Sequence, residues 1–535
     1  MRHCVVAVLA LTVIAVSPAA GAPVQTPQRG GTVVFGPVAE SGCLNPFRDC
    51  GGSGPQFFWI LQKVLPPAFV VAPDFTRRPA LVSQVTFTRT APFTLTYAIR
   101  PEARWSDGVP VTARDFLFTH QAIRKHFPPD DVHRSYVRSI RAVDAKTVRV
   151  VLRSRYAGWR RLFWFVVPQH ALAGEDLTRI WTDGVENPKT GRPIGSGPFL
   201  VGDWDRGKQL TLVRNPSYWG RHKAYLDRLI VRFCQAACLA PPPTEVLESV
   251  RTGAVDFTYA RDTEIVTDLR RIRGMTVRLH RSNGWEHLDL NRASGGHPAL
   301  RNKGVRQAFA HSIDRAETVR RLWGEIDPTY RPLHSAVLLG TARGYAPNWN
   351  GYAYRPDLAR RLLERAGCRR GADDIYVCGG ERLSLRFSTL PTRARQRGLE
   401  LMQAQLRRVG IEVVLSYGRG LFDQILAGDF DVVSFAWLGV DGFGQKGVYA
   451  CGGYQNWTGY CQRLVTADLD QADRILDERQ RARVLNRVDR QLAKDVPVIP
   501  LYQIPWVLAY KDTLQDVVPS PESLFWNAED WWLER

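Results

Sequence analysis

The segment GFGQKG, Gly442 to Gly447, has the spacing that most directly suggests chemistry. A GxGxxG pattern between a strand and a helix binds the phosphates of a dinucleotide, because the glycines allow a tight turn and the helix N-terminus offers free amides. The apolar run DVVSFAWL does precede the glycines. The run that follows, VYACGGYQNW, has no helical stripe and contains a cysteine, so we expect no phosphate-binding helix and no dinucleotide here.

Motifs of other enzyme classes are absent from the sequence. HExxH, Walker and zinc-finger spacings do not occur, and GSG at Gly195 to Gly197 does not complete the GxSxG motif of serine hydrolases. Asp373 and Asp374 are paired carboxylates, but adjacency in sequence does not place two acids on opposite sides of one bond. The sequence therefore favours a protein that is not an enzyme and that needs no cofactor and no metal.

An export signal is predicted at the N-terminus. The start MRHCVVAVLALTVIAVSPAAGAP combines a basic residue, an apolar run from Cys4 to Val16 and small residues at Ala19 to Ala22. We expect residues 1–22 to be removed as a cleavable signal peptide. No cysteine directly follows the apolar run, so no lipid anchor is expected. No later stretch reaches the roughly 20 apolar residues of a membrane-spanning helix.

Eight cysteines remain after the signal peptide, and an even number in an exported chain predicts disulfides. Eight cysteines allow about 105 pairings, but these form four close pairs separated by long gaps, which favours local bridges. No CxxC pair is present and no histidine lies at ligand spacing from any cysteine, which argues against a metal site. The expected bridges are Cys43 with Cys50, Cys234 with Cys238, Cys368 with Cys378, and Cys451 with Cys461.

The 535-residue chain carries a formal net charge of +20 at pH 7. This charge is compatible with nucleic-acid binding, but an exported protein seldom meets nucleic acid. The basic residues are also interleaved with acids on helical faces, as in ERQRARVLNRVDR, which predicts a solvated surface and no nucleic-acid partner. A weaker attraction to acidic ligands or to an anionic membrane surface stays open. The length predicts two to four domains.

Helices and strands alternate along the chain, which predicts an α/β fold. In TEVLESVRTGAVDFTY, Thr244 is expected to cap a helix that Gly253 ends, and a strand begins at Val255. In RGLELMQAQLRRVGIEVVLSY, the apolar stripe over 399–409 predicts a helix that stops at Gly410 before the next strand.

The stretch RWSDGVPVTARDFLFTHQAI, which begins at Arg104, is expected to join a strand to a helix. The preceding PFTLTYAIRP alternates apolar and polar residues, as in a strand with one buried face. Ser106 to Gly108 are turn residues, and Thr112 with Asp115 has the spacing of a capping box at a helix N-terminus.

Four stretches, taken in chain order, carry a family resemblance. They are WSDGVPVTARDFLFT, GSGPFLVGDWDRGKQLTLVRNPSYWG from Gly195, LDLNRASGGHPALRNKGVRQAFAHSIDRAETV from Leu288, and GDFDVVSFAW from Gly428. Together they resemble the solute-binding protein family 5, the extracytoplasmic oligopeptide and dipeptide receptors of ABC importers. The resemblance spans the mature chain. It implies a monomer in the periplasm or at the cell surface that delivers a captured solute to an ABC importer permease in the membrane, without catalysis.

The resemblance also implies a fold. We expect a two-lobe α/β flytrap of the periplasmic-binding-protein type, type II and cluster C, which closes on its ligand about a hinge of two crossings. An extra domain is expected as an insertion in the first lobe, and Trp105 then belongs to its scaffold, away from the cleft. The expected division is lobe I over 30–60, 190–265 and 498–535, the inserted domain over 61–189, and lobe II over 266–497.

By the same resemblance the ligand lies between the lobes. In peptide-binding members an aspartate shortly after the strand ending in Trp437 accepts the peptide's α-ammonium, and Asp441 is the first candidate here. Such a partner is needed, because a buried ammonium without one costs on the order of several kcal/mol. Alternatively, Asp441 is a solvated loop residue and Trp437 fills lobe II. Glu40 and Asn45 are expected to line the first-lobe side of the cleft. Trp285 is expected to line the cleft where the chain enters the second lobe.

Two classes of function stay open at this point. A binding protein needs a cleft and a hinge, and its expected ligands are oligopeptides or dipeptides. Other members of the resembled family take nickel complexes, haem, opines or oligosaccharides. A secreted hydrolase of the same size is the alternative class, and it requires a nucleophile or an acid pair that the motifs above do not supply.

Overall fold

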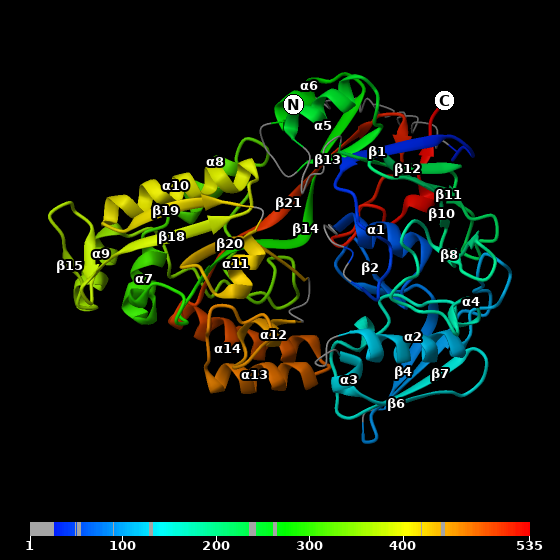
Figure 1. Cartoon of the computed structure of the whole chain (residues 1–535), viewed down its shortest axis with the longest axis horizontal. Coiled ribbons are helices and arrows are strands. Elements are labelled where there is room, and N and C mark those ends of the chain that lie inside the picture. Colours follow the sequence, from blue (N-terminus) through cyan, green and yellow to red (C-terminus); the bar gives the residue numbers. More distant parts are fainter. Residues whose placement is uncertain are drawn as a thin grey trace, which may run out of the picture.

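The computed structural model describes residues 26–48, 50, 55–88, 90–127, 132–234, 242–260, 265–418, 420–439 and 444–535. The expected signal peptide, Cys238 and Asp441 lie outside these residues. The described chain is a mixed α/β structure, in which two masses of helices and strands are joined by long strands (Figure 1). This confirms the predicted fold class.

The central sheet connects the two masses. Within the described residues it has ten strands and is mixed, since β1 pairs with β12 in parallel while β10 pairs with β11 in antiparallel fashion. In spatial order the strands are β10 (Phe199–Asp205), β11 (Gln209–Arg214), β12 (Arg228–Phe233), β1 (Thr32–Val38), β13 (Phe257–Ala260), β21 (Val498–Lys511), β14 (Met275–Leu290), β20 (Val432–Leu438), β18 (Ser384–Thr389) and β19 (Glu412–Tyr417).

Two long neighbouring strands, β14 and β21, run through the middle of this sheet from one mass to the other (Figure 1). The first part of β14, residues 275–281, pairs with the part of β21 that also pairs with β13. The second part, residues 284–290, pairs with β20. The register of the β14–β21 ladder shifts between Arg281 and Trp285, so the two masses meet at an irregular point of a two-stranded crossing.

A large apolar core lies on each side of the crossing. The first core holds residues from Val33 to Phe257 and from Trp506 to Trp531. The second holds residues from Trp285 to Tyr502 together with Val71. We call the parts of the chain packed around these cores lobe I and lobe II. Apart from Val71, the clustered apolar residues of the expected inserted domain belong to the first core, so they share an apolar interior with lobe I.

A separate four-stranded antiparallel sheet lies in lobe I, in the order β4 (Val82–Phe87), β5 (Thr94–Ile99), β7 (Thr147–Leu152) and β6 (Val137–Ala142). β5 alternates buried and half-buried residues, as the sequence predicted. α2 (Ala113–His126) begins with the predicted capping box, in which Asp115 accepts a hydrogen bond of 2.7 Å from the Thr112 amide. Trp105 is fully buried, which agrees with a scaffold role.

The remaining elements are short strands and the helices that cover the sheets. The short ladders are β2 (Phe69–Val71) with β3 (Arg77–Pro79), β8 (Glu186–Asn187) with β9 (Arg192–Pro193), β15 (Arg369–Arg370) with β16 (Tyr376–Cys378) and β17 (Glu381–Arg382), and β22 (Leu514–Gln515) with β23 (Trp532–Leu533). The other helices are α1 (Pro55–Val64), α3 (Val132–Tyr136), α4 (Gln169–Leu172), α5 (Pro243–Arg251), α6 (Val266–Arg271), α7 (Lys303–His311), α8 (Arg315–Trp323), α9 (Pro356–Arg365), α10 (Arg393–Val409), α11 (Leu421–Ala427), α12 (Gln445–Tyr449), α13 (Arg463–Arg474) and α14 (Glu478–Asp495).

Two helix boundaries test the sequence patterns. α10 ends at Gly410, whose φ of 101° is a left-handed conformation that glycine adopts without strain, as predicted. α5 begins at Pro243 with Pro242 as its N-cap, so the prediction that Thr244 caps this helix is wrong. Proline suits the first helical turn because its missing N–H would have no partner there.

The GFGQKG segment also differs from the expectation. A short helix, α12, begins within it at Gln445, where the sequence indicated no helix. The helix has five residues, so it is too short to display the apolar stripe by which longer helices are recognised. Gly442 and its neighbour Phe443 lie outside the described residues.

Three of the four predicted disulfides are confirmed: Cys43 with Cys50, Cys368 with Cys378, and Cys451 with Cys461. Cys234 is disulfide-bonded as well. Its expected partner, Cys238, lies outside the described residues, so that pairing stays a prediction.

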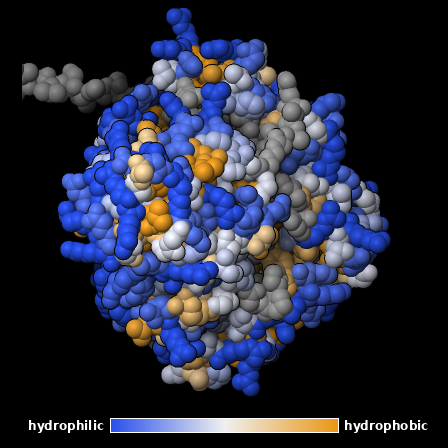
Figure 2. Space-filling view, turned by 60° about the vertical axis from the view of Figure 1, so that its left-hand side comes forward, coloured by the Kyte–Doolittle hydropathy of each residue, from blue (hydrophilic) through white to orange (hydrophobic). Residues whose placement is uncertain are grey.

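Charged side chains pair with one another on the helix surfaces. Arg487 of α14 binds Asp468 of α13 at 2.6 Å, and Arg360 binds Asp357 within α9 at 2.7 Å. The face drawn in Figure 2 is mostly hydrophilic, and its hydrophobic residues form small separate patches. The basic residues therefore lie on a solvated surface beside acids, as the sequence predicted.

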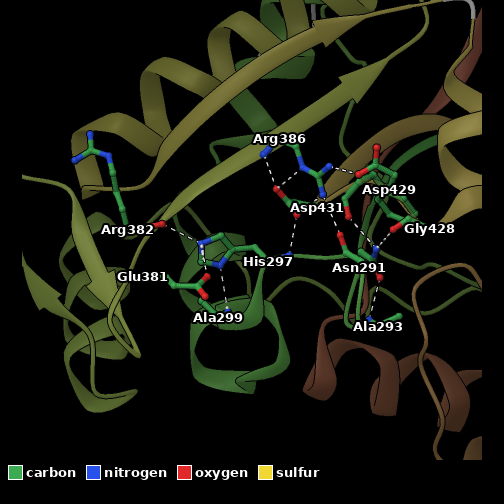
Figure 3. A network of polar contacts seen from close by, with 12 residues as sticks. Asn291, Ala293, His297, Ala299, Glu381, Arg382, Arg386, Gly428, Asp429 and Asp431 are labelled. Atoms are coloured by element: carbon green, nitrogen blue, oxygen red, sulfur yellow. Dashed lines mark hydrogen bonds and ion pairs between the residues drawn. The ribbon is translucent and has the colours of Figure 1, made fainter.

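A network of polar contacts closes one end of the lobe II sheet (Figure 3). Asp431, which precedes β20 and is 4% exposed, accepts hydrogen bonds from the amides of His297 at 2.7 Å and Arg386 at 2.8 Å. The Arg386 guanidinium binds both Asp431 and the exposed Asp429. Asn291 donates to the carbonyls that precede β20. These contacts hold the chain after β14 against the starts of β18 and β20.

Asp431→Ala is expected to lower the free energy of unfolding by about 1–3 kcal/mol, because two partly buried amides and part of a guanidinium lose their acceptor. The matched control is Asp429→Ala, which removes an exposed partner of the same arginine and should cost less than about 1 kcal/mol. Urea denaturation followed by circular dichroism measures both values. Equal losses for the two variants would contradict the role assigned to Asp431.

Candidate functional site

Two of the predicted ligand-binding residues, both tryptophans, lie at the end of the β14–β20 ladder. Trp285 lies directly opposite Trp437 in the antiparallel register, and Gly284 lies opposite Leu438. Trp285 is 3% exposed, whereas Leu438 at the strand end is 60% exposed. The ladder therefore brings two of the five predicted site residues together, beside the point where the chain passes between the lobes.

Trp437 is the centre of an aromatic cluster on one face of this ladder. Its ring stacks on Trp457 at a centroid distance of 5.4 Å and on His287 at 5.8 Å, with interplanar angles of 20° and 12°. Phe435 packs edge-on against the rings of Trp437 and His287. Trp457 comes from the loop closed by the disulfide between Cys451 and Cys461, so that bridge helps to position the cluster.

The indole N–H of Trp437 is a buried donor with no acceptor among the described residues. Leaving such a donor unpaired costs about 1–3 kcal/mol, so an oxygen that accepts its hydrogen bond is stabilised there. A tryptophan thus offers an apolar ring together with one directional polar group. This arrangement is suited to a ligand that carries carbonyl or carboxylate oxygens beside apolar groups.

Glu286 points to the opposite face of β14 and forms a buried ion pair with Arg395 at the start of α10. Hydrogen bonds of 2.9 and 3.0 Å join the guanidinium to both carboxylate oxygens, and Ser434 donates to the same carboxylate at 2.8 Å. The two charged side chains are 4% and 12% exposed. Burial by itself raises the pKa of Glu286, but Arg395 and the hydrogen bonds outweigh it, and the pKa is lowered. The pair ties α10 to β14 and β20.

Glu286→Gln is expected to destabilise the protein by about 3–5 kcal/mol at neutral pH, because the buried Arg395 loses its counter-charge. A pKa that is lowered on folding contributes stability above the unfolded value, near 4.5, and that contribution is lost as the pH falls through the folded pKa. The difference between wild type and variant should therefore shrink on acidification below about pH 4.5.

Urea unfolding of both proteins between neutral pH and about pH 3 measures this difference. Glu317→Gln, which removes a surface partner of Arg320 and Arg321, is the control and should cost less than about 1 kcal/mol throughout. A loss in Glu286→Gln that does not change with pH would contradict the assignment.

Glu40 is held within lobe I. Its carboxylate accepts hydrogen bonds from the Trp204 indole at 2.8 Å, from the Gly207 amide at 3.0 Å and from Arg206 at 3.3 Å. The Arg206 guanidinium also lies over the Trp204 ring, 3.8 Å from its centroid. Both carboxylate oxygens therefore already have donors in lobe I, and a ligand role for Glu40 stays a prediction.

Asn45 is fully buried, and its amide is engaged by the chain around it. Its Nδ2 donates to the carbonyls of Leu177 at 2.8 Å and Ile180 at 3.0 Å, and its Oδ1 accepts from the Phe47 amide. These contacts fasten the loop of the first disulfide to the 177–180 segment. The structure gives Asn45 these internal contacts, and its ligand role stays a prediction.

Asp441 lies outside the described residues, so its position is not part of the site described above. The last described residue before it, Gly439, donates its amide to the Asn283 carbonyl at 3.0 Å and has a φ of 154°. The chain therefore leaves β20 at the crossing between the lobes.

Sequence reasoning missed several residues that shape the site. His287, Glu286 and Arg395 were not selected, although a glutamate and a histidine inside the apolar strand WEHLDL are a signal of buried polar contacts. Trp457 carries no such signal, because only the tertiary fold brings its loop to β20. The sequence selected Trp437 and Trp285 through the family resemblance.

The described part of the chain contains no group of three or more histidine, cysteine, aspartate or glutamate side chains placed to hold a metal ion. None of its helices combines the length and the apolar composition that crossing a membrane requires.

The fold of two lobes joined by two crossing strands, with an aromatic site beside the crossing, is that of a periplasmic binding protein. The structure is similar to the periplasmic EDTA-binding protein EppA, with a TM-score of 0.86, 23% identity and coverage of 97% of this chain and 100% of that one. It is also similar to the oligopeptide-binding protein AppA of Bacillus subtilis, solved with a nonapeptide, with a TM-score of 0.79, 19% identity and coverage of 95% and 100%.

Sequence comparison identifies the family. Residues 77–459 match the bacterial extracellular solute-binding proteins, family 5. The oligopeptide-binding protein OppA of Mycobacterium tuberculosis is 28% identical over 477 residues, which cover 86% of this chain and 78% of that protein. The chain belongs to the family 5 extracellular solute-binding proteins.

Proposed function

We propose that this protein is the peptide-binding component of an ABC importer, which captures oligopeptides or dipeptides outside the cytoplasm. The observation that carries the proposal is the similarity along 86% of the chain to a relative named for oligopeptide binding. The aromatic site supports it, because the peptide main chain supplies carbonyl oxygens for the Trp437 N–H, and peptide side chains supply apolar groups for the stacked rings.

The ligand is bound between the lobes, and the β14–β21 crossing serves as the hinge. Lobe I then comprises 30–60, 190–265 and 498–535, with an inserted domain over 61–189, and lobe II comprises 266–497. Two covalent crossings allow the lobes to rotate as rigid bodies, so ligand binding shifts the population towards the closed form. A monomer, exported after removal of residues 1–22, delivers the peptide to a membrane permease.

Asp441 is the proposed partner of the peptide α-ammonium. It is the first carboxylate after β20, and the nearest described acid on that strand's ladder, Glu286, is already neutralised by Arg395. Gly442 and Gly444 beside it allow the backbone to approach a ligand closely. Trp437 and Trp285 would pack against the same end of the peptide.

Asp441→Asn is expected to weaken binding of a free peptide by about 2–5 kcal/mol, or some thirtyfold to several thousandfold, because the ligand ammonium loses its counter-charge while the shape is kept. Titration calorimetry with one peptide and its N-acetylated form provides the measurement. Wild type should prefer the free amine, and the variant should lose most of that preference.

The matched control is Asp423→Asn, which changes an exposed aspartate of α11 in the same lobe and should leave the preference for the free amine intact. If acetylation does not weaken binding to the wild type, the ammonium partner is not Asp441. Native mass spectrometry of the freshly isolated protein tests the ligand class separately, and a co-purifying ligand that is not a peptide would overturn the proposed function.

A further inference from the structure

The lobes also touch far from the crossing strands. The end of α13 in lobe II approaches α3 in lobe I, on the side of the molecule opposite to the β14–β21 crossing (Figure 1). Tyr136 at the end of α3 and Asp473 in the last turn of α13 are 337 positions apart, yet they are hydrogen-bonded. The lobes are therefore joined by covalent strands at one end and by this contact at the other.

Two hydrogen bonds converge on Asp473 from lobe I. The Tyr136 hydroxyl donates to the Asp473 carboxylate at 2.8 Å, and the Ala157 amide donates to the Asp473 main-chain carbonyl at 2.7 Å. The last four carbonyls of a helix have no partner inside the helix. The Ala157 amide therefore completes the C-terminal end of α13, so a helix of lobe II is capped by lobe I. Tyr136 is in turn stacked on Tyr156, with ring centroids 4.1 Å apart.

An apolar contact adjoins these hydrogen bonds. Leu476, two residues after α13 ends, is partly buried and packs against the first core. Together with Phe87, Phe93 and Trp159 it lines a small pocket at the surface of lobe I. The contact thus combines directional hydrogen bonds with the packing of a lobe II side chain against lobe I.

The Asp473 carboxylate is partly buried in this contact. Burial raises its pKa, while the hydrogen bond from Tyr136 and the charges of Lys446 and Arg481 act in the opposite direction. Asp470 also faces it, and that residue is itself paired with Lys446 at 2.5 Å. A hydrogen bond that is partly screened from water contributes more than one that is fully exposed.

We propose that Tyr136, Ala157, Asp473 and Leu476 form a clasp that closes the interlobe space opposite the hinge and thereby limits the length of the bound peptide. The inference rests on the proposed function. Every atom of the clasp belongs to the chain, so its formation needs no ligand group. A peptide short enough to lie between hinge and clasp is fully enclosed, whereas a longer one must break the clasp to bind.

The test compares the wild type with Tyr136→Phe combined with Leu476→Ala. Phenylalanine at position 136 keeps the stack on Tyr156 but cannot donate to Asp473. Alanine at position 476 removes the side chain that packs against the first core. Asp468→Ala is the matched control, because Asp468 lies on the same helix but pairs with Arg487 inside lobe II. Asp473→Asn keeps an acceptor oxygen for Tyr136 and should behave as the wild type. Circular dichroism verifies that each variant is folded.

Small-angle scattering of the ligand-free proteins and calorimetry with peptides from two to about sixteen residues are the two measurements. The double variant should have a larger radius of gyration than the wild type and the control. The affinity of the wild type for peptides longer than a limiting length should be at least about tenfold lower than its affinity for shorter ones. The double variant should recover most of that loss for the long peptides. Short peptides should bind the double variant about tenfold more weakly, because the closed form is less populated.

The outcomes separate this inference from the proposed function. If peptides bind but the length dependence is the same in wild type and double variant, the clasp does not limit length. If no peptide binds the wild type, both the proposed function and the length limit fail. The radius of gyration of the double variant, compared with that of the wild type, then decides whether the clasp holds the lobes together. An unchanged radius of gyration in the double variant overturns the clasp.

Discussion

The antiparallel ladder between β14 and β21 is the constraint on which the rest of the structure depends. These two strands are the middle of the central sheet and serve both lobes, since β14 pairs with β21 beside β13 in its first part and with β20 in its second. Their backbone hydrogen bonds align the lobes, and the ladder shifts register twice near the crossing, between Arg281 and Trp285 and between Glu286 and His287. Most of each core lies on its own side of the crossing, and the exceptions include Val71, which belongs to the second core, and Leu476, which packs against the first.

Two buried carboxylates fasten the lobe II sheet at its two ends. Asp431 holds the start of β20 through Arg386 and the His297 amide, and Glu286 holds the other end of the ladder through Arg395. β20 spans the distance between them, roughly 20 Å for seven residues. The aromatic cluster around Trp437 lies at the second anchor, so it rests on strands that a buried ion pair holds in place.

The acids described near the crossing already have partners within the protein. Glu40 is bonded to Trp204, Arg206 and Gly207, and Glu286 is neutralised by Arg395. Neither acid is therefore free to balance a ligand ammonium without losing an internal partner. What the described residues of the ladder do provide is an aromatic wall and one unpaired indole N–H. The proposed binding of peptide main-chain oxygens and apolar side chains rests on these groups.

The sequence by itself determined the features that depend on near neighbours: the capping box at Thr112, the helix stop at Gly410, the alternation in β5 and three local disulfides. It also identified the family, because the four motifs and their order can be read from the sequence alone. The misplaced cap at Thr244 and the short helix α12 show that even local patterns fail where a helix starts with proline or is too short. Only the tertiary structure decided which charges are paired. Glu286 meets Arg395 across 109 positions and Tyr136 meets Asp473 across 337, and partners so distant leave no periodic or local pattern in the chain.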